Sequence, residues 1–114
     1  MANYHLSIKV FSRGNGDSAV EKAAYRAGQK LLSDYNGNLY DYTKKRGVVH
    51  TGILLPDHAP REYADRTTLW NAVENSERNG NAQLAREIEI SLPVELSIEQ
   101  NINLALEYVK HIFD

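Results

Sequence analysis

The sequence predicts an α+β fold in which an antiparallel sheet is covered by helices, with elements in the order β-α-β-β-α-β-α. Residues 4–12 and 83–93 alternate apolar and polar side chains with a period of two, as half-buried strands do. Two capping boxes each precede a run of helical periodicity, Ser18 with Glu21 and Ser97 with Gln100. The 114 residues are 42% hydrophobic and 25% charged, which is typical of one small globular domain.

The first two elements are a strand at residues 4–12 and a helix that begins after Ser18. The strand places Leu6 and its apolar neighbours on one face and His5 on the opposite, polar face. Two glycines in RGNGD end the strand. We expect the helix to run to about Leu32 and to turn one stripe toward the sheet, formed by Val20, Ala23, Ala24, Ala27 and Leu31.

A turn and a hairpin follow the first helix. The sequence YNGN at residues 35–38 predicts the turn. The segments LYDYT (39–43) and VVHTGILLP (48–56) flank KKRG, and they predict two paired strands with Gly47 at a position of positive φ.

The second half contributes two helices and one strand. A helix is predicted from about Thr67 to Arg78, a strand at residues 83–93, and a last helix after Ser97. The final letters, HIFD, fall at the end of that helix. Because a capped amphipathic helix normally leads to another element, we expect the domain to be incomplete.

Composition excludes several classes of protein. Without cysteine there are no disulfides, no thiolate chemistry and no cysteine zinc sites, which fits a cytoplasmic protein. No apolar run is long enough for membrane insertion, and the start lacks a secretion signal. Residues 1–50 hold eight Lys/Arg against four acids, net +4, whereas residues 51–114 hold five against eleven, net −6. The first half is therefore suited to binding a polyanion, although an uneven distribution of solvated surface charge would give the same two net charges.

Tyr25 in GDSAVEKAAYRAG is the residue that packing explains least. Helical geometry puts it far from the apolar stripe, at the rim or in solvent, with small Gly28 one turn on. One interpretation is a tyrosine covering the edge of the core. The other is a phenol nucleophile or ligand contact, which needs help from a cation or a base. Lys22 and Arg26 flank it, and Arg13 comes from the preceding turn.

Acids and histidines give no complete site. Glu87 and Glu89 project from one face of the strand at 83–93, where they could hold a cation, orient a histidine or act as a base; the alternative is a solvated face. No two of the four histidines stand at metal-ligand spacing. The residues themselves thus assemble no metal site.

Three stretches resemble the MobA/MobL relaxases, the plasmid mobilisation nickases of the HUH endonuclease class. They are YHLSIKVFSRGNGDSAVEKAAYRAG, GVVHTGILLPDHAP with DRTTLWNAVENSERNGNAQLAREIEISLP, and VELSIEQNINLALEYV. The resemblance covers essentially all 114 residues. It implies that residues 1–114 are the amino-terminal portion of a single relaxase domain, an incomplete HUH relaxase-type fold.

The resemblance also implies an activity. Such relaxases cut one phosphodiester of single-stranded DNA at the origin of transfer, and a tyrosine stays linked to the 5′ end. The nucleophile falls on Tyr25, and the acid that supports the metal site falls on Glu87, with Glu89 as the fallback. His5 matches the pattern in a supporting role. The expected phosphate contacts are basic residues of the first half, namely Arg13, Lys22, Arg26, Lys44, Lys45 and Arg46.

The resemblance departs from the family pattern at the metal. The family holds Mg²⁺ or Mn²⁺ with a histidine cluster on a strand that follows the last helix, so we expect these 114 residues to contain no metal ligands of that kind and to be catalytically incomplete. Expected partners are relaxosome and coupling proteins, and an exposed sheet edge would allow self-association. Tyr40 and Tyr42 either stack bases or pack across the hairpin. The alternatives are a non-catalytic DNA-binding or origin-recognition module and, third, an unrelated protein-interaction domain.

Overall fold

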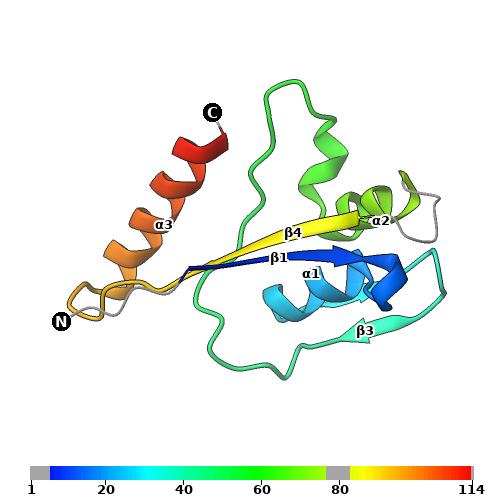
Figure 1. The fold of residues 1–114 in the computed structure, drawn as a ribbon, viewed down its shortest axis with the longest axis horizontal. Helices are drawn as coiled ribbons and strands as arrows, with labels where there is room; N and C mark the ends of the chain where they lie inside the picture. The colour runs from blue at the N-terminus through cyan, green and yellow to red at the C-terminus, as the bar shows by residue number, and fades with distance from the viewer. Residues whose placement is uncertain (1–5, 77–82, 114) are drawn as a thin grey trace. The chain divides into compact units, whose positions relative to one another are not determined.

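The computed structural model describes residues 6–76 and 83–113 (Figure 1). The main elements follow one another as β1 (Leu6–Ser12), α1 (Ala19–Ala27), β2 (Lys30–Leu32), β3 (Leu39–Asp41), α2 (Arg66–Ser76), β4 (Gln83–Ile90) and α3 (Ile98–Phe113). Short 3-10 helices lie at Arg13–Asn15 and Arg61–Ala64. The fold is α+β with small antiparallel sheets, as predicted, and its elements follow the predicted order β-α-β-β-α-β-α, although the segments that form the two middle strands differ from those expected.

The strands form two sheets of two strands each. β1 pairs with β4, and β2 pairs with β3 in antiparallel register with Leu31 opposite Tyr40. The chain divides into two compact units, residues 10–86 and residues 1–9 with 87–114. Tyr25 and all six predicted phosphate contacts belong to the first of these, whereas Glu87 and Glu89 belong to the second.

Helix α1 begins as predicted and ends earlier than predicted. The Ser18 hydroxyl accepts a hydrogen bond from the Glu21 backbone N–H at 3.2 Å, so the N-cap is confirmed. The expected run to Leu32 is wrong, because Gly28 takes the left-handed conformation (φ 64°) and terminates the helix at Ala27. A glycine lacks the Cβ that makes this conformation costly for other residues.

The predicted hairpin around KKRG is also wrong. Residues 39–41 pair with β2, and residues 48–56 form no strand. The YNGN turn instead brings residues 30–32 beside residues 39–41. At this turn the Ser33 N–H donates to the Asn38 carbonyl at 2.9 Å, and Gly37 adopts φ 75°. Gly47 does have the predicted positive φ, at 88°, within an irregular segment.

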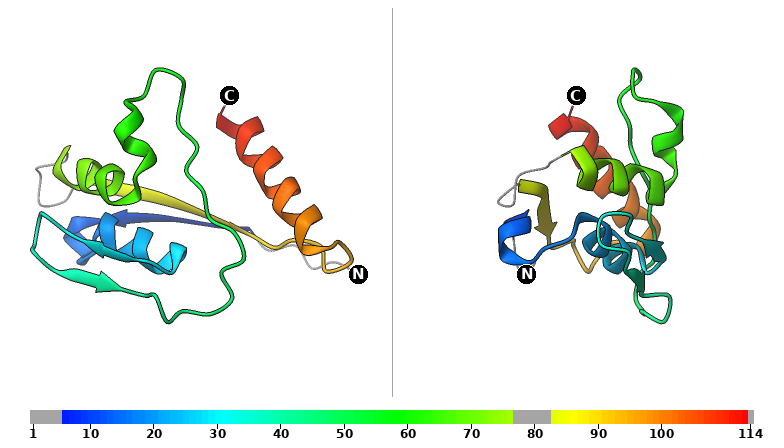
Figure 2. Two further views of the ribbon diagram at one scale, coloured as in Figure 1. Left: turned by 180° about the vertical axis from the view of Figure 1, so that it is seen from behind. Right: turned by 90° about the vertical axis from the view of Figure 1, so that its right-hand side faces the viewer.

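The core of residues 10–86 lies on one side of α1. Val20, Ala24 and Leu31 are buried together, and the side chain of Trp70 on α2 packs against them. Figure 2 shows α1 and α2 from two further directions. On β1 the expected alternation of burial is not found within residues 6–12: Phe11, from the face expected to be polar, is the buried residue, and Leu6, Ile8 and Val10 are exposed. Phe11 is covered by α1, whose Lys22 and Arg26 lie over its ring.

The last helix and the strand before it match the prediction closely. Ser97 and Gln100 form a reciprocal capping box, with backbone-to-side-chain bonds of 2.9 and 3.1 Å. β4 ends at Ile90 instead of continuing to residue 93, the position of a proline, which has no N–H for a strand ladder. The predicted end of α2 at Arg78 lies outside the described residues. None of the helices within the described ranges is long and apolar enough to cross a membrane.

Candidate active site around Tyr25

Tyr25 lies on the exposed side of α1. Its side chain is 47% exposed, whereas Val20 and Ala24 on the same helix are fully buried. The helix is therefore fixed to the core by its small apolar face, and the tyrosine ring stands on the opposite side, as the sequence predicted. Position alone leaves open what holds the ring there.

Two side chains from the segment after β3 hold the Tyr25 ring. Tyr42 meets it edge to face, with ring centroids 5.2 Å apart and an interplanar angle of 89°. The Lys45 ammonium lies 3.7 Å from the Tyr25 centroid and also donates to the Tyr25 backbone carbonyl at 2.9 Å. Within the described part of the chain, no residue hydrogen-bonds to the Tyr25 hydroxyl. The ring is thus fixed while its hydroxyl stays available.

Tyr42 is itself fixed to α1. Its hydroxyl donates to the Glu21 carboxylate at 3.0 Å, and its backbone N–H donates to the Gln29 carbonyl at 3.1 Å. The hydrogen bond to Glu21 raises the pKa of the Tyr42 phenol above its ordinary value near 10, with desolvation and the charge of Glu21 adding to the effect. The Tyr42 hydroxyl is thereby held on α1 as a hydrogen-bond donor to Glu21.

A buried carboxylate that the sequence analysis did not single out fixes the start of α1. Glu74 of α2 is 1% exposed. It accepts hydrogen bonds from the Ser18 hydroxyl at 2.9 Å and from the Ala19 backbone N–H at 3.0 Å, and Arg13 lies 3.3 Å from its second oxygen. A negative charge at a helix N-terminus is favourable, and the buried charge is compensated by Arg13. Its position four residues after Trp70 on the inward face of α2 is the signal that could have revealed it.

The six predicted phosphate contacts differ in how available they are. Lys44 and Arg46 are exposed, and Arg26 is exposed with its guanidinium bonded to the Lys22 carbonyl. Lys22 lies 3.6 Å from Asp17. The Arg13 side chain is only 10% exposed, bonds to Glu74 and lies over the Tyr35 ring at 4.2 Å. Arg13 therefore has a structural role in the fold, and Lys45 contacts Tyr25.

The predicted acids do not complete a metal site. Glu87 is half-buried and Glu89 exposed, both on β4, and each has a partner within the protein. His5 lies outside the described residues. Across residues 6–76 and 83–113, no group of three His, Asp or Glu side chains could hold a metal ion. The described residues therefore form no complete metal site by themselves.

Tyr40 and Tyr42 pack against the core. Both lie on the cluster of Val20, Ala24 and Leu31, and the Tyr40 hydroxyl accepts from the Asn36 amide at 2.8 Å. Of the two interpretations of these tyrosines, the contacts favour packing.

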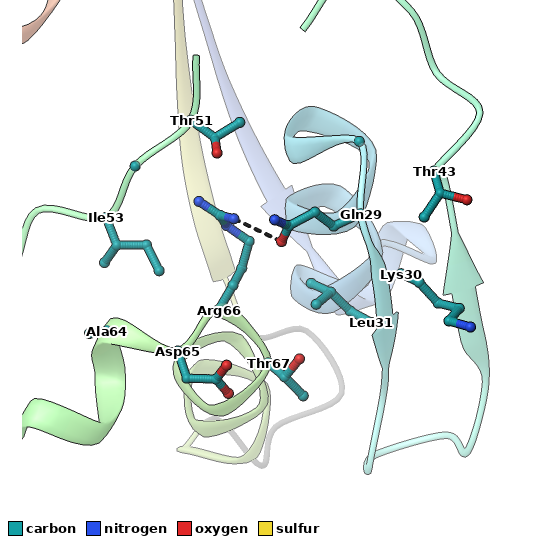
Figure 3. Close-up of a pocket in the computed structure, with 12 residues that line it drawn as sticks. Gln29, Lys30, Leu31, Thr43, Thr51, Ile53, Ala64, Asp65, Arg66 and Thr67 are labelled. Atoms are coloured by element: carbon teal, nitrogen blue, oxygen red, sulfur yellow. Dashed lines mark hydrogen bonds between the residues drawn. The ribbon is translucent and has the colours of Figure 1, made fainter. Parts of the chain in front are cut away.

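A polar hollow of about 610 Å³ lies beyond the end of α1. Figure 3 shows the Arg66 guanidinium donating to the Gln29 side-chain carbonyl in it, at 2.8 Å. Thr43, Thr51 and Asp65 contribute further polar groups to its lining. Tyr25 is not among the lining residues, so the hollow adjoins the tyrosine helix without containing the tyrosine.

Comparison with known proteins shows which family the chain belongs to. The model of the MobA/MobL family matches residues 17–114, the segment that includes α1 and Tyr25. The chain belongs to the MobA/MobL family. The resemblance carried by the sequence motifs is thereby confirmed.

Named relatives of this MobA/MobL chain include mobilisation and transfer proteins. It is 47% identical to the mobilization protein MobL of Acidithiobacillus ferridurans, over all of this chain and 29% of that protein. It is 41% identical to the conjugal transfer protein TraA of Rhizobium radiobacter, over 97% of this chain and 11% of that protein. The chain thus spans less than a third of the length of these relatives.

A solved structure shares the fold. It comes from work on the molecular basis of vancomycin resistance transfer in Staphylococcus aureus, and it matches with a TM-score of 0.91 and 37% identity. The match covers 96% of this MobA/MobL chain and 56% of the solved one. The elements around Tyr25 therefore belong to a known fold.

Proposed function

We propose that residues 1–114 form the amino-terminal portion of a single HUH-class relaxase domain that nicks single-stranded DNA at an origin of transfer, with Tyr25 as the nucleophile. Membership of the MobA/MobL family supports a role in plasmid mobilisation. The observation that carries the assignment of Tyr25 is its geometry: a half-exposed ring held by Tyr42 and Lys45, with the hydroxyl unbonded within the described residues.

The proposed step is a transesterification. The Tyr25 oxygen attacks the scissile phosphorus, and the bond from phosphorus to the 3′ oxygen breaks. The phenol proton is lost and the 3′ oxygen gains one, so a free 3′ hydroxyl and a 5′-phosphotyrosyl bond replace one phosphodiester and one phenol. Because one phosphodiester is exchanged for another, the 3′ hydroxyl can reverse the step.

Basic residues near α1 supply the proposed contacts with the DNA backbone. Arg26, Lys44 and Arg46 are exposed cations of the same unit as Tyr25. Lys22 and Lys45 lie beside them, each with a partner on the protein already. Cations along a single strand supply affinity that depends on salt and little on sequence. Arg13, the sixth predicted phosphate contact, is bonded to Glu74, so its proposed contribution is to support the fold.

The acids of β4 have a proposed role at a metal site. Glu87, with Glu89 as the alternative and His5 in support, is proposed to assist a metal site of the full-length protein that takes Mg²⁺ or Mn²⁺. The described residues alone do not fit such a site, so no step above involves a metal. We propose accordingly that residues 1–114 are catalytically incomplete by themselves.

The proposed setting follows from the mobilisation role. Accessory relaxosome proteins and coupling proteins are the proposed partners, and the cytoplasm is the proposed location. Each strand of the described sheets has one neighbour, so each has an edge at which a second copy could pair.

A covalent-adduct assay tests the function. The full-length protein is incubated with Mn²⁺ or Mg²⁺ and a single-stranded origin oligonucleotide labelled at its 3′ end, and products are separated on a denaturing gel. We expect the label to migrate with the protein, and Tyr25→Phe to abolish this band. Tyr35→Phe is the matched control, because Tyr35 is likewise exposed and keeps its ring under Arg13.

Two results would contradict the proposal. An adduct formed by Tyr25→Phe at the normal rate would remove Tyr25 from the reaction. Binding of the oligonucleotide by the wild-type protein without any adduct would favour the alternative of a non-catalytic origin-recognition module.

A further inference from the structure

Lys45 contacts Tyr25 at two points, which a lysine that served only to bind DNA would not need to do. Its ammonium is 3.7 Å from the Tyr25 ring centroid and 2.9 Å from the Tyr25 backbone oxygen. These two contacts span the residue from its backbone to its ring. A cation over an aromatic face is attracted to the ring, more strongly when partly shielded from water, and Lys45 is half-buried.

The backbone that carries Lys45 is tied to the end of α1. Lys45 N–H donates to the Tyr42 carbonyl at 3.0 Å, and Tyr42 N–H donates to the Gln29 carbonyl. An added Cβ at Gly28 would lie 3.4 Å from the Val48 side chain, 3.7 Å from the Tyr42 carbonyl and 4.0 Å from Lys45. The segment 42–48 is therefore packed directly on the C-terminal turn of the tyrosine helix.

Tyr42 makes a second contact with the Tyr25 ring. Its ring meets the Tyr25 ring edge to face at 89°, and its hydroxyl is anchored on Glu21 one turn earlier in the same helix. Thus the Tyr25 ring has Tyr42 and Lys45 as neighbours, both carried by one short segment. Rotation of the ring about its χ1 angle would break both contacts at once.

We propose that Lys45 and Tyr42 are positioning residues that hold the Tyr25 ring in the orientation for attack on the scissile phosphate. This rests on the proposed function of Tyr25 and gives Lys45 a role other than a phosphate contact. Holding a nucleophile in its reactive geometry removes orientational freedom before the reaction, and a misplacement of about 1 Å can cost about 10²-fold in rate.

Single-turnover cleavage at saturating DNA and separate measurement of Kd distinguish positioning from phosphate binding. In the full-length protein we expect Lys45→Met to lower the cleavage rate constant by about 10²-fold, with Kd changed less than about threefold. Lys45→Arg keeps the cation and should recover most of the rate.

Tyr42→Phe keeps the ring, loses the Glu21 bond and should give an intermediate loss of the cleavage rate constant. Lys30→Met is the matched control, since Lys30 is an exposed lysine of the same unit without contact to Tyr25.

A spectroscopic measurement keeps the inference testable apart from the reaction. With the full-length protein labelled at tyrosine ring carbons, Lys45→Met should shift the Tyr25 ring signals and Lys30→Met should not. Cleavage by Lys45→Met at the wild-type rate, or a loss confined to Kd, would overturn the positioning role. If Tyr25→Phe still cleaves, the proposed function fails, whereas the ring signals still report whether Lys45 holds Tyr25.

Discussion

The Tyr25 side chain is held at its ring and at its backbone, while its hydroxyl makes no hydrogen bond within the described residues. A tyrosine whose only task was to cover the edge of the core would need neither a lysine over its ring nor a second tyrosine fixed to its own helix. This arrangement supports the interpretation of Tyr25 as a nucleophile over that of a rim residue.

The pKa of the Tyr42 phenol should lie above the ordinary tyrosine value near 10. Its pKa is raised chiefly by the hydrogen bond to Glu21, so the stabilisation from this contact is fully present below pH 10. It is lost as the pH rises through the higher pKa of the folded state. Following tyrosine ionisation by absorbance near 295 nm, we expect Tyr42→Phe to remove a transition whose midpoint lies above pH 10. Loss of a transition at or below pH 10 instead would contradict the account of this contact.

Helices α1 and α2 are joined through one buried carboxylate. Glu74→Ala should lower the free energy of unfolding by about 3 kcal/mol, because it removes one partner of the buried Arg13–Glu74 ion pair and the acceptor for Ser18 and Ala19. Urea denaturation measures this loss. The control Glu62→Ala changes an exposed acid and should stay within about 0.5 kcal/mol of wild type. Equal effects of the two substitutions would mean that Glu74 does not secure α1.

The end of α1 depends on the backbone of Gly28. Because Gly28 has φ 64°, Gly28→Ala should lower the free energy of unfolding by about 1 kcal/mol, since side chains with a Cβ are disfavoured in the left-handed region. The control Gly52→Ala lies outside that region, and its added Cβ would make an ordinary contact with His50 at 3.8 Å. Thermal unfolding should therefore separate the two variants. A Gly28→Ala protein as stable as Gly52→Ala would contradict the assigned helix end.

Capping and periodicity predicted the elements better than their pairing. The N-caps at Ser18 and Ser97 could be predicted, as could the strands β1 and β4, because their signals lie within a few consecutive residues. The partner of residues 39–41 was not, because residues 30–32 were expected to end the helix, whereas the turn at residues 35–38 brings them beside residues 39–41 as a strand. The exposed position of Tyr25 could be predicted from its misfit on the helix surface, whereas the contacts of Glu74 and of Lys45 depend on residues distant in sequence.

The charge of the whole molecule is divided between its two halves. The net charge of −2 conceals the positive first half, which carries Tyr25 and the exposed cations. Salt dependence of DNA binding reports on such cations, because each neutralised phosphate of a single strand contributes a slope of about 0.7 in log K against log salt.

Replacing both exposed cations of the KKRG segment should reduce that dependence. We expect Lys44→Gln with Arg46→Gln to lower the slope by about 1.4, measured by fluorescence anisotropy of a single-stranded oligonucleotide between low and physiological salt. Lys110→Gln in α3 removes one exposed charge from the acidic half and should leave the slope unchanged. A slope insensitive to the double substitution would place the DNA elsewhere.

Mapping the covalent adduct tests the central claim most directly. The full-length protein is reacted with single-stranded origin DNA, trimmed with nuclease and digested with trypsin, which should release residues 23–26, AAYR, between Lys22 and the following Ala27. We predict that the residual nucleotide is attached to this peptide at Tyr25 through a 5′ phosphate. Attachment at another residue, or through a 3′ phosphate, would contradict the account.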